Sequence, residues 1–122
     1  MATILVLDDV LDAVTLLQRI LEKKGHEVCG FTEEEQAIGH VGANKVDLAI
    51  LDIKLKKMNG VEVLEELKKL DPQIRVIMLT GYPTLESARE SLELGASEYC
   101  VKPIDKDEIE EKVEKVLGTR TA

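Results

Sequence analysis

Three aspartates follow two apolar runs of the chain, and together they could hold a cation. Asp8 and Asp9 end the run over residues 2–9, and Asp52 ends the run over residues 46–52. Two carboxylates about 4 Å apart repel by about 4 kcal/mol at an effective dielectric constant of about 20. A close cluster must therefore be protonated, be neutralised by a lysine or bind a cation. An oxygen-rich site that leaves room for water and phosphate suits Mg²⁺.

Each aspartate could instead have a structural role. Aspartate is favoured at helix N-termini, so Asp8 or Asp9 could cap the helix that follows. Asp52, taken alone, could cap a loop. Capping explains one member of the pair, but two successive aspartates are more than it requires.

A hydroxyl group and an ammonium group follow two further apolar runs. Thr80 ends the run that leads to Gly81, and Lys102 follows the run over residues 97–101. A threonine at a strand end is often structural, and a lysine before a proline is often solvated. Together with the three aspartates, however, they place five functional groups at the ends of four predicted strands.

Alternating strands and helices must position these residues. Short apolar, β-branched runs predict strands, and apolar helical spacing with glycine or proline at the ends predicts helices. The expected strands cover residues 2–9, 26–31, 46–52, 73–81 and 97–101. The expected helices cover residues 10–24, 33–41, 60–70, 84–94 and 105–117, with Gly25 and Gly95 just beyond the first and fourth. The buried face expected for the first helix is Val10, Val14, Leu17 and Leu21.

This alternation predicts a doubly wound α/β domain with a parallel sheet covered on both faces. Of the two common strand orders, the flavodoxin-like order 2-1-3-4-5 fits this length best. The first and third strands are then neighbours, so Asp8, Asp9 and Asp52 converge where ligands bind such sheets. A dinucleotide-binding domain would need a glycine-rich turn after the first strand, whereas two aspartates stand there and would repel a pyrophosphate.

The composition limits the domain count and excludes several function classes. A chain of 122 residues that is 44% hydrophobic can form one compact domain with a substantial core. A net charge of -8 and the scarcity of aromatic residues argue against direct nucleic-acid binding. No apolar stretch reaches the length of a membrane span, and the N-terminus lacks the features of a signal peptide. We therefore expect a cytoplasmic protein that binds neither nucleic acid nor membrane.

The cysteines and histidines give no sign of a second site. Cys29 and Cys100 fall on the two edge strands of the predicted order, roughly 19 Å apart across four inter-strand gaps. A disulfide needs Cα atoms within about 7 Å, so we expect two free thiols, as is usual in a reducing cytosol. His26 and His40 lack the spacing of metal ligands, and we expect both at the surface.

The set of strand-end residues resembles the receiver domain of two-component response regulators, and the resemblance extends over almost the whole chain. The matching motifs are LVLDD, LAILD followed by MNG, LTG, and the YCVKP segment. The resemblance implies a receiver domain over residues 1–118 and a short tail over residues 119–122, with no output domain in this chain.

The resemblance implies a phosphoacceptor and a metal site. Asp52 corresponds to the aspartate that accepts a phosphoryl group from a histidine kinase or a histidine phosphotransfer protein. Asp8, Asp9 and Asp52 correspond to the Mg²⁺ ligands, aided by the main-chain carbonyl of Lys54. The chemistry agrees, because a carboxylate is a competent phosphoryl nucleophile, and Mg²⁺ and a lysine neutralise charge on the transferred group. Such a protein catalyses its own phosphorylation and dephosphorylation rather than the turnover of a separate substrate.

The resemblance also implies a switch. Thr80 corresponds to the hydroxyl that moves to the phosphoryl group, Lys102 to the lysine that pairs with it, and Tyr99 to an aromatic residue whose rotation is coupled to that movement. The implied output surface comprises the fourth helix, the fifth strand and the fifth helix. There an effector protein or an attached output domain would bind, or a homodimer would form on phosphorylation. The candidate polar contacts are Arg89, Glu90, Glu93, Lys106 and Glu110, although each could also be an ordinary solvated charge.

Two positions depart from the family pattern. Lys56 stands where the family often has a proline, in a loop that also contains Lys54 and Lys57. This basic loop could attract an anionic phosphodonor or contact a kinase, or it could simply be solvated. Val10 replaces a third acid often found after the aspartate pair, which matters little because metal binding needs only the pair.

Two other functions are alternatives. A phosphohydrolase of the haloacid dehalogenase type also uses an aspartyl nucleophile, Mg²⁺, a hydroxyl and a lysine on a similar sheet. Its nucleophile follows the first strand, with a second acid two residues later, but Val10 occupies that position here and Lys54 the equivalent position after Asp52. The other alternative is an interaction module of the same fold that is not phosphorylated, against which the presence of all five site residues argues.

Overall fold

Strands and helices alternate as predicted in the computed structural model, which describes residues 1–55 and 57–118. The expected tail over residues 119–122 lies outside the described residues. The strands are β1 (Thr3–Leu7), β2 (Glu27–Phe31), β3 (Leu48–Leu51), β4 (Arg75–Thr80) and β5 (Glu98–Val101). The helices are α1 (Leu11–Lys23), α2 (Glu34–Ala43), α3 (Gly60–Leu70), α4 (Leu85–Glu93) and α5 (Lys106–Gly118). Each strand is shorter than the run that predicted it, because the flanking residues belong to the connections with the helices.

The strands in the described part of the chain form one parallel sheet in the order β2-β1-β3-β4-β5, which confirms the predicted order. Leu7 at the end of β1 is in register with Leu51 at the end of β3, and Leu51 is in register with Met78 of β4. Just beyond these paired ends, the backbone N–H of Asp52 donates a hydrogen bond of 3.0 Å to the carbonyl oxygen of Leu7. The residues that follow β1 and β3 therefore lie side by side at one edge of the sheet.

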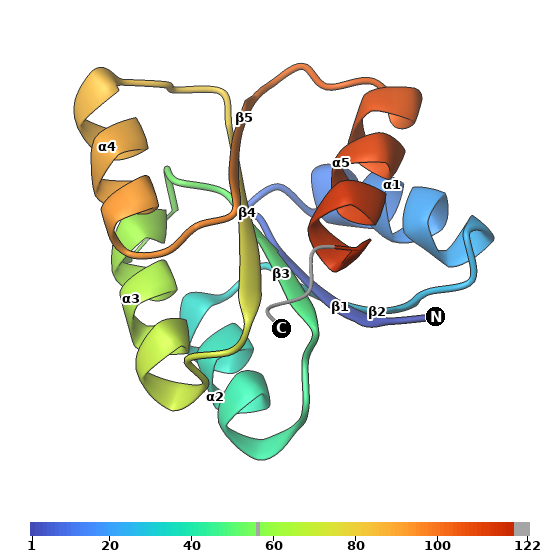
Figure 1. Cartoon of the computed structure of the whole chain (residues 1–122), viewed down its shortest axis with the longest axis horizontal. Helices are drawn as coiled ribbons and strands as arrows, with labels where there is room; N and C mark the ends of the chain where they lie inside the picture. The colour runs from blue at the N-terminus through green and yellow to red at the C-terminus, as the bar shows by residue number, and fades with distance from the viewer. Residues whose placement is uncertain (56, 119–122) are drawn as a thin grey trace.

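Helices cover both faces of the sheet. Figure 1 shows α1 and α5 on one face and α2, α3 and α4 on the other. Each face has its own aliphatic core, to which α1 and α5 contribute on one side and α2 and α3 on the other. All four residues of β3 are buried, which explains why its sequence is continuously apolar rather than alternating. Among the described helices, none has the length and apolar character needed to cross a membrane.

The N-terminus of α1 differs from the prediction in one residue. Val14, Leu17 and Leu21 are buried as expected. Val10 is instead the N-cap residue, with extended backbone, and is 54% exposed. The apolar spacing in the sequence therefore begins one residue before α1. The prediction that Val10 belongs to the buried face of this helix is wrong.

Three glycines fix the ends of helices. Gly25 after α1 and Gly95 after α4 have φ angles of 89° and 97°, in the left-handed region that favours glycine, as their predicted positions require. Gly60 begins α3 for a different reason, because a Cβ atom at this position would overlap the carbonyl oxygen of Asp52. The preceding residue, Asn59, caps α3 through its side chain. Gly60 thus allows the helix to start directly against the backbone of the predicted phosphoacceptor.

The two cysteines are not joined by a disulfide, and each histidine contacts another residue of the fold. Cys29 on β2 and Cys100 on β5 are free thiols on opposite edges of the sheet, as predicted. His26 Nδ1 accepts a hydrogen bond of 3.2 Å from the backbone N–H of Ala2. The ring of His40 lies 5.3 Å from that of Phe31.

Candidate functional site

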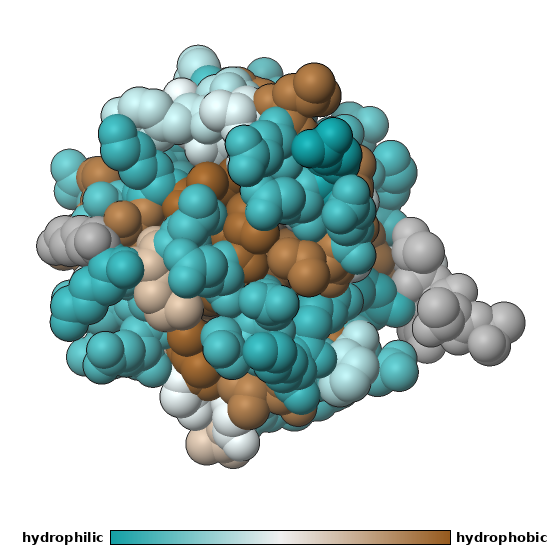
Figure 2. Space-filling model, turned by 90° about the vertical axis from the view of Figure 1, so that its left-hand side faces the viewer, coloured by the Kyte–Doolittle hydropathy of each residue, from teal (hydrophilic) through white to brown (hydrophobic). Residues whose placement is uncertain are grey.

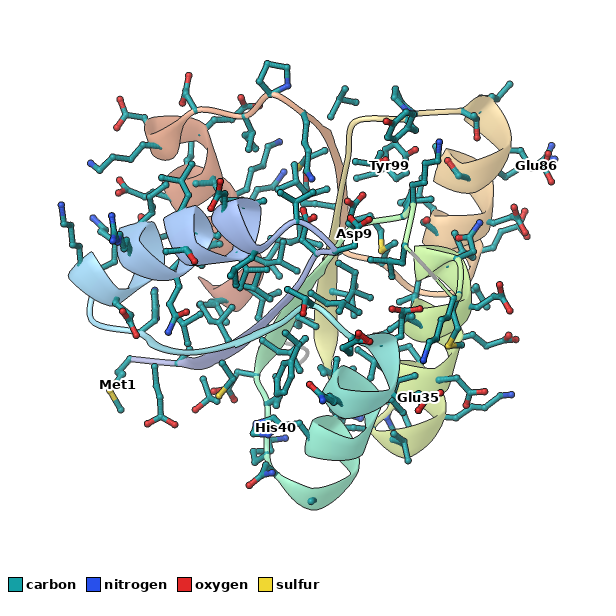
Figure 3. All side chains as sticks on the ribbon, turned by 180° about the vertical axis from the view of Figure 1, so that it is seen from behind. Met1, Asp9, Glu35, His40, Glu86 and Tyr99 are labelled. Carbon is teal, nitrogen blue, oxygen red and sulfur yellow. The ribbon has the colours of Figure 1, made fainter. Side chains whose placement is uncertain are left out.

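Asp8, Asp9 and Asp52 meet at the carboxyl edge of the sheet. Each offers one carboxylate oxygen, and these oxygens lie within 4.8 Å of one another. Asp8 and Asp52 are 2% and 7% exposed, whereas Asp9, labelled in Figure 3, is half-buried. Neither Asp8 nor Asp9 is the N-cap residue of α1, because Val10 occupies that position and makes no side-chain cap hydrogen bond. Asp8 Oδ1 instead accepts a hydrogen bond from the backbone N–H of Val10. The structure thus brings together the acids that the sequence singled out.

Lys102 joins two of these acids. Its ammonium nitrogen lies 2.5 Å from Asp8 Oδ2 and 3.3 Å from Asp52 Oδ2. The backbone positions this side chain, because the N–H of Lys102 donates a hydrogen bond of 2.8 Å to the carbonyl oxygen of Thr80. Burial alone would lower the pKa of Lys102, but the hydrogen bonds and charges of Asp8 and Asp52 outweigh burial and raise it. Lys102 is therefore a fixed positive charge in the site.

Asp52 has one buried oxygen that no described residue contacts by a hydrogen bond. This atom, Oδ1, has no hydrogen-bond partner among residues 1–55 and 57–118, while Oδ2 contacts Lys102. Burial, followed by the negative charge of Asp8, raises the pKa of Asp52 above its ordinary value, and Lys102 opposes this change. A buried carboxylate oxygen without a partner is costly, and such an atom suits a site that receives a ligand.

A cavity of about 290 Å³ opens beside Asp52. Its lining includes Asp9, Asp52 and Lys102, together with Lys54 and Tyr82 from the neighbouring loops. The donor set of the aspartate cluster consists of carboxylate oxygens, which are the ligands that Mg²⁺ prefers. The three aspartates therefore fit a divalent cation, and the cavity that Asp9, Asp52 and Lys102 line has room for an anionic group beside it.

Lys54 and Tyr82 contact each other at the rim of this cavity. The Lys54 ammonium nitrogen lies 4.2 Å from the centroid of the Tyr82 ring, a cation–π contact. The predicted role of Lys54 in metal binding concerns its main-chain carbonyl, because an ammonium group has no lone pair to offer a metal ion. Sequence reasoning did not assign Tyr82 to the site, although it lies two residues beyond Thr80, at the end of a strand that was already implicated.

Thr80 is fully buried at the end of β4. Its hydroxyl oxygen accepts a hydrogen bond of 2.9 Å from the backbone N–H of Tyr82. A hydroxyl can accept one hydrogen bond and still donate its own hydrogen, so this contact leaves Thr80 able to act as a donor. The backbone hydrogen bond between Thr80 and Lys102 holds these two predicted site residues on adjacent strands.

Tyr99 links β5 to α4. Its ring is half-buried against the core on the α2–α4 side of the sheet, and Figure 3 shows its position beside α4. The Tyr99 hydroxyl lies 2.7 Å from Ser87 Oγ, within hydrogen-bond distance. Ser87 also forms the capping box of α4 with Thr84. Sequence reasoning missed Ser87, although the pattern of Thr84 followed three residues later by a polar residue resembles a capping box.

The expected output surface combines charged and apolar side chains. Arg89, Glu90, Glu93 and Lys106 are exposed, and Glu110 forms an ion pair of 3.3 Å with Lys106. Leu85, Leu92 and Val101 on the same elements are 85%, 58% and 49% exposed. Figure 2 shows the side of the molecule that carries α3 and α4, with apolar surface between hydrophilic side chains.

The sequence and the fold match those of known proteins. A family model described as response regulator receiver domain matches residues 4–114. Sporulation initiation phosphotransferase F of Bacillus subtilis (strain 168) is 39% identical over 118 residues, which cover 97% of this chain and 95% of that protein. A crystal structure of a CheY-like response regulator receiver domain protein from Methanospirillum hungatei JF-1 has a TM-score of 0.94 and 35% sequence identity, and it covers 97% of this chain and 94% of that chain.

Longer proteins match as well. The transcriptional regulatory protein ZraR of Escherichia coli (strain K12) is 37% identical over 115 residues, which cover 94% of this chain but 26% of that protein. The chain therefore spans about a quarter of the length of this curated relative.

Proposed function

Because this chain belongs to the response regulator receiver domain family, we propose that it is a signalling switch that accepts a phosphoryl group on Asp52. The observation that carries the proposal is the buried, unpartnered Oδ1 of Asp52, beside a cavity that Lys102 and Asp9 also line. Family membership also argues against the haloacid dehalogenase-type phosphohydrolase.

The proposed reaction transfers a phosphoryl group from a phosphohistidine of a kinase or phosphotransfer protein. A carboxylate oxygen of Asp52 forms the new O–P bond as the P–N bond to the donor imidazole breaks. The P–N bonding pair stays on the departing nitrogen, and a proton already carried by the other ring nitrogen of the phosphohistidine lets the imidazole leave as the neutral base. Asp8, Asp9 and Asp52, with the main-chain carbonyl of Lys54, would hold Mg²⁺, which when bound neutralises charge on the equatorial oxygens. Lys102 supplies a second positive charge to the same oxygens.

The switch proposed for this chain runs from the phosphoryl group to α4 and β5. Thr80 can donate its hydroxyl hydrogen to a phosphoryl oxygen, because the hydrogen bond with Tyr82 engages only the hydroxyl oxygen. Movement of Thr80 would vacate space that the ring of Tyr99 can enter. The ring would then lose its hydrogen bond to Ser87, which also caps α4. Differential contacts of this kind are what a population shift requires.

The proposed partners follow from the two ends of this route. A histidine kinase or histidine phosphotransfer protein would approach Asp52. A downstream effector, an attached output domain or a second copy of the chain would use the surface formed by α4, β5 and α5. The exposed Leu85, Leu92 and Val101 provide apolar area on that surface for such a contact.

Phosphorylation by a small-molecule donor tests the proposal directly. Incubation with acetyl phosphate and Mg²⁺ should add one phosphoryl group, detected by mass spectrometry of the intact protein. Asp52→Asn should abolish the adduct, whereas the control Asp107→Asn, at an exposed position in the first turn of α5, should retain it. An undiminished adduct in Asp52→Asn would overturn the assignment. A folded protein that forms no adduct under these conditions would support the phosphorylation-independent interaction module.

A further inference from the structure

Glu34 is the first residue of α2, yet its side chain is almost fully buried. Its exposed fraction is 2%, whereas its neighbour Glu35, labelled in Figure 3, is exposed. A carboxylate is seldom buried without a specific partner, because removal from water penalises the charged form. The sequence places Glu34 within a run of three glutamates, which is typical of a solvated helix start. Its burial therefore calls for a physical cause.

The cause is a pair of hydrogen bonds to the loop between β3 and α3. Glu34 Oε2 accepts hydrogen bonds from the backbone N–H groups of Lys57 and Met58, at 2.7 and 2.8 Å. Burial alone would raise the pKa of Glu34, but hydrogen bonds from its own backbone N–H and from those of Lys57 and Met58 outweigh burial and lower it. Hydrogen bonds to an ionised acceptor are roughly twice as strong as neutral ones. Glu34 is thus a charged anchor for a loop that lies outside its own helix.

The anchored loop is the one that follows Asp52. Its base is closed by a hydrogen bond of 2.7 Å from the N–H of Gly60 to the carbonyl oxygen of Ile53 and by a bridge between Lys54 and Asn59. The contacts of Glu34 lie further along the loop, at Lys57 and Met58. Backbone contacts within the loop therefore hold its base, and Glu34 of α2 holds the described residues beyond the base.

We propose that Glu34 is a positioning residue for the phosphorylation site, whose buried carboxylate holds the loop after Asp52 so that the Lys54 carbonyl faces the aspartate cluster. The inference rests on the proposed function in one respect, the role of Lys54 as a main-chain metal ligand. Glu34 itself does not contact a ligand; it acts through the backbone of the loop. Residues that orient metal ligands typically change metal affinity by 10- to 100-fold when they are replaced.

The test compares Glu34→Ala and Glu34→Gln with the control Glu35→Ala on the same helix. Isothermal titration should show a Kd for Mg²⁺ about tenfold higher or more in Glu34→Ala. Glu34→Gln keeps a carbonyl oxygen that can accept both hydrogen bonds, so it should rescue part of the affinity. Glu35→Ala should bind Mg²⁺ like the unmodified protein. Amide hydrogen exchange at Lys57 and Met58 should show the largest loss of protection in Glu34→Ala, a smaller loss in Glu34→Gln and none in Glu35→Ala.

A second control separates positioning from general destabilisation. Val113→Ala removes buried methyl groups from the core on the opposite face of the sheet, so it should reduce stability without changing Mg²⁺ affinity. If Glu34→Ala does not fold, the same comparison is made with Glu34→Gln, which should then show intermediate Mg²⁺ affinity and intermediate protection. An unchanged Kd for Mg²⁺ in the folded Glu34 variants would overturn the inference while leaving phosphorylation of Asp52 intact. Absence of an acetyl phosphate adduct in the unmodified protein would instead overturn the proposed function.

Discussion

The ammonium group of Lys102 is held more closely by Asp8, at 2.5 Å, than by Asp52, at 3.3 Å. Its closer partner is thus a predicted metal ligand rather than the predicted phosphoacceptor. Mg²⁺ and Lys102 would compete for the negative charge of Asp8. Metal binding should therefore weaken the contact between Lys102 and Asp8, which leaves the lysine available to a group on Asp52.

Lys102→Met should separate two effects of the lysine: it neutralises Asp8 and Asp52, and it competes with Mg²⁺ for Asp8. Without the ammonium group, Asp8 and Asp52 remain buried and unneutralised, so the metal-free protein should lose about 1–3 kcal/mol of unfolding free energy, after a discount for the partial exposure of the lysine. Removal of the competitor should also raise the affinity for Mg²⁺. Urea unfolding in EDTA and titration with Mg²⁺ measure the two effects.

The control Lys106→Met breaks a surface pair with Glu110 and should change stability by less than about 0.5 kcal/mol. Equal stability of the two variants would contradict the neutralising role of Lys102.

Asp52→Asn should stabilise the metal-free protein at neutral pH. Burial, and then the charge of Asp8, raise the pKa of Asp52 above its ordinary value of 3.8, so ionisation is less favourable in the folded state than in the unfolded state. The resulting penalty is fully present above the folded pKa and disappears as the pH falls toward 3.8. Urea unfolding in EDTA should therefore show a more stable variant at pH 7 and a difference that shrinks on acidification. Lower stability of the variant at pH 7 would mean that the pairing with Lys102 outweighs the cost of burial.

Much of this arrangement was predictable from local sequence. Continuous apolar runs identified the buried strands, and the residue after each run identified the site, because the carboxyl ends of parallel strands share one edge. Gly95 was predictable as the end of α4, because its positive φ is a local requirement. Glu34 and Tyr82 were not, since each owes its role to a contact with another segment: Glu34 to the backbone of the loop after β3, and Tyr82 to Lys54. Local pattern cannot reveal such partners.

Gly60→Ala should disturb the site through the backbone of Asp52, the predicted phosphoacceptor. An added Cβ would overlap the carbonyl oxygen of Asp52, so α3 must shift, and we expect a loss of about 1–3 kcal/mol in unfolding free energy. Phosphorylation by acetyl phosphate should also slow. Gly39→Ala is the matched control within α2, where an added Cβ has no described residue within 4 Å, and it should stabilise the protein by about 0.5–1 kcal/mol. Thermal unfolding of both variants gives the comparison, and a neutral effect at Gly60 would show that α3 can move away from Asp52 at no cost.

The route from Asp52 to α4 predicts how structural change should spread on activation. Amide NMR shifts with and without beryllofluoride, which mimics an acyl phosphate, should change at Asp52, Thr80 and Tyr99 and along α4. Thr80→Ala should confine the changes to the surroundings of the metal, because the methyl group that remains cannot donate a hydrogen bond to the bound group. Tyr99→Phe lacks the hydrogen bond to Ser87 and should shift the resonances at the start of α4 even before activation.

These variants distinguish a switch from a passive site. If Thr80 and Tyr99 form one two-position element, Tyr99→Phe weakens the contact that holds the ring beside Ser87, so the active-like population should rise without a phosphoryl group. One hydrogen bond contributes about 0.5–1.5 kcal/mol, which corresponds to a change of roughly 2- to 13-fold in the ratio of the two states. Beryllofluoride should then produce smaller further changes in α4 of Tyr99→Phe than in the unmodified protein. Changes confined to the metal site in the unmodified protein would show that Thr80 and Tyr99 do not carry the signal.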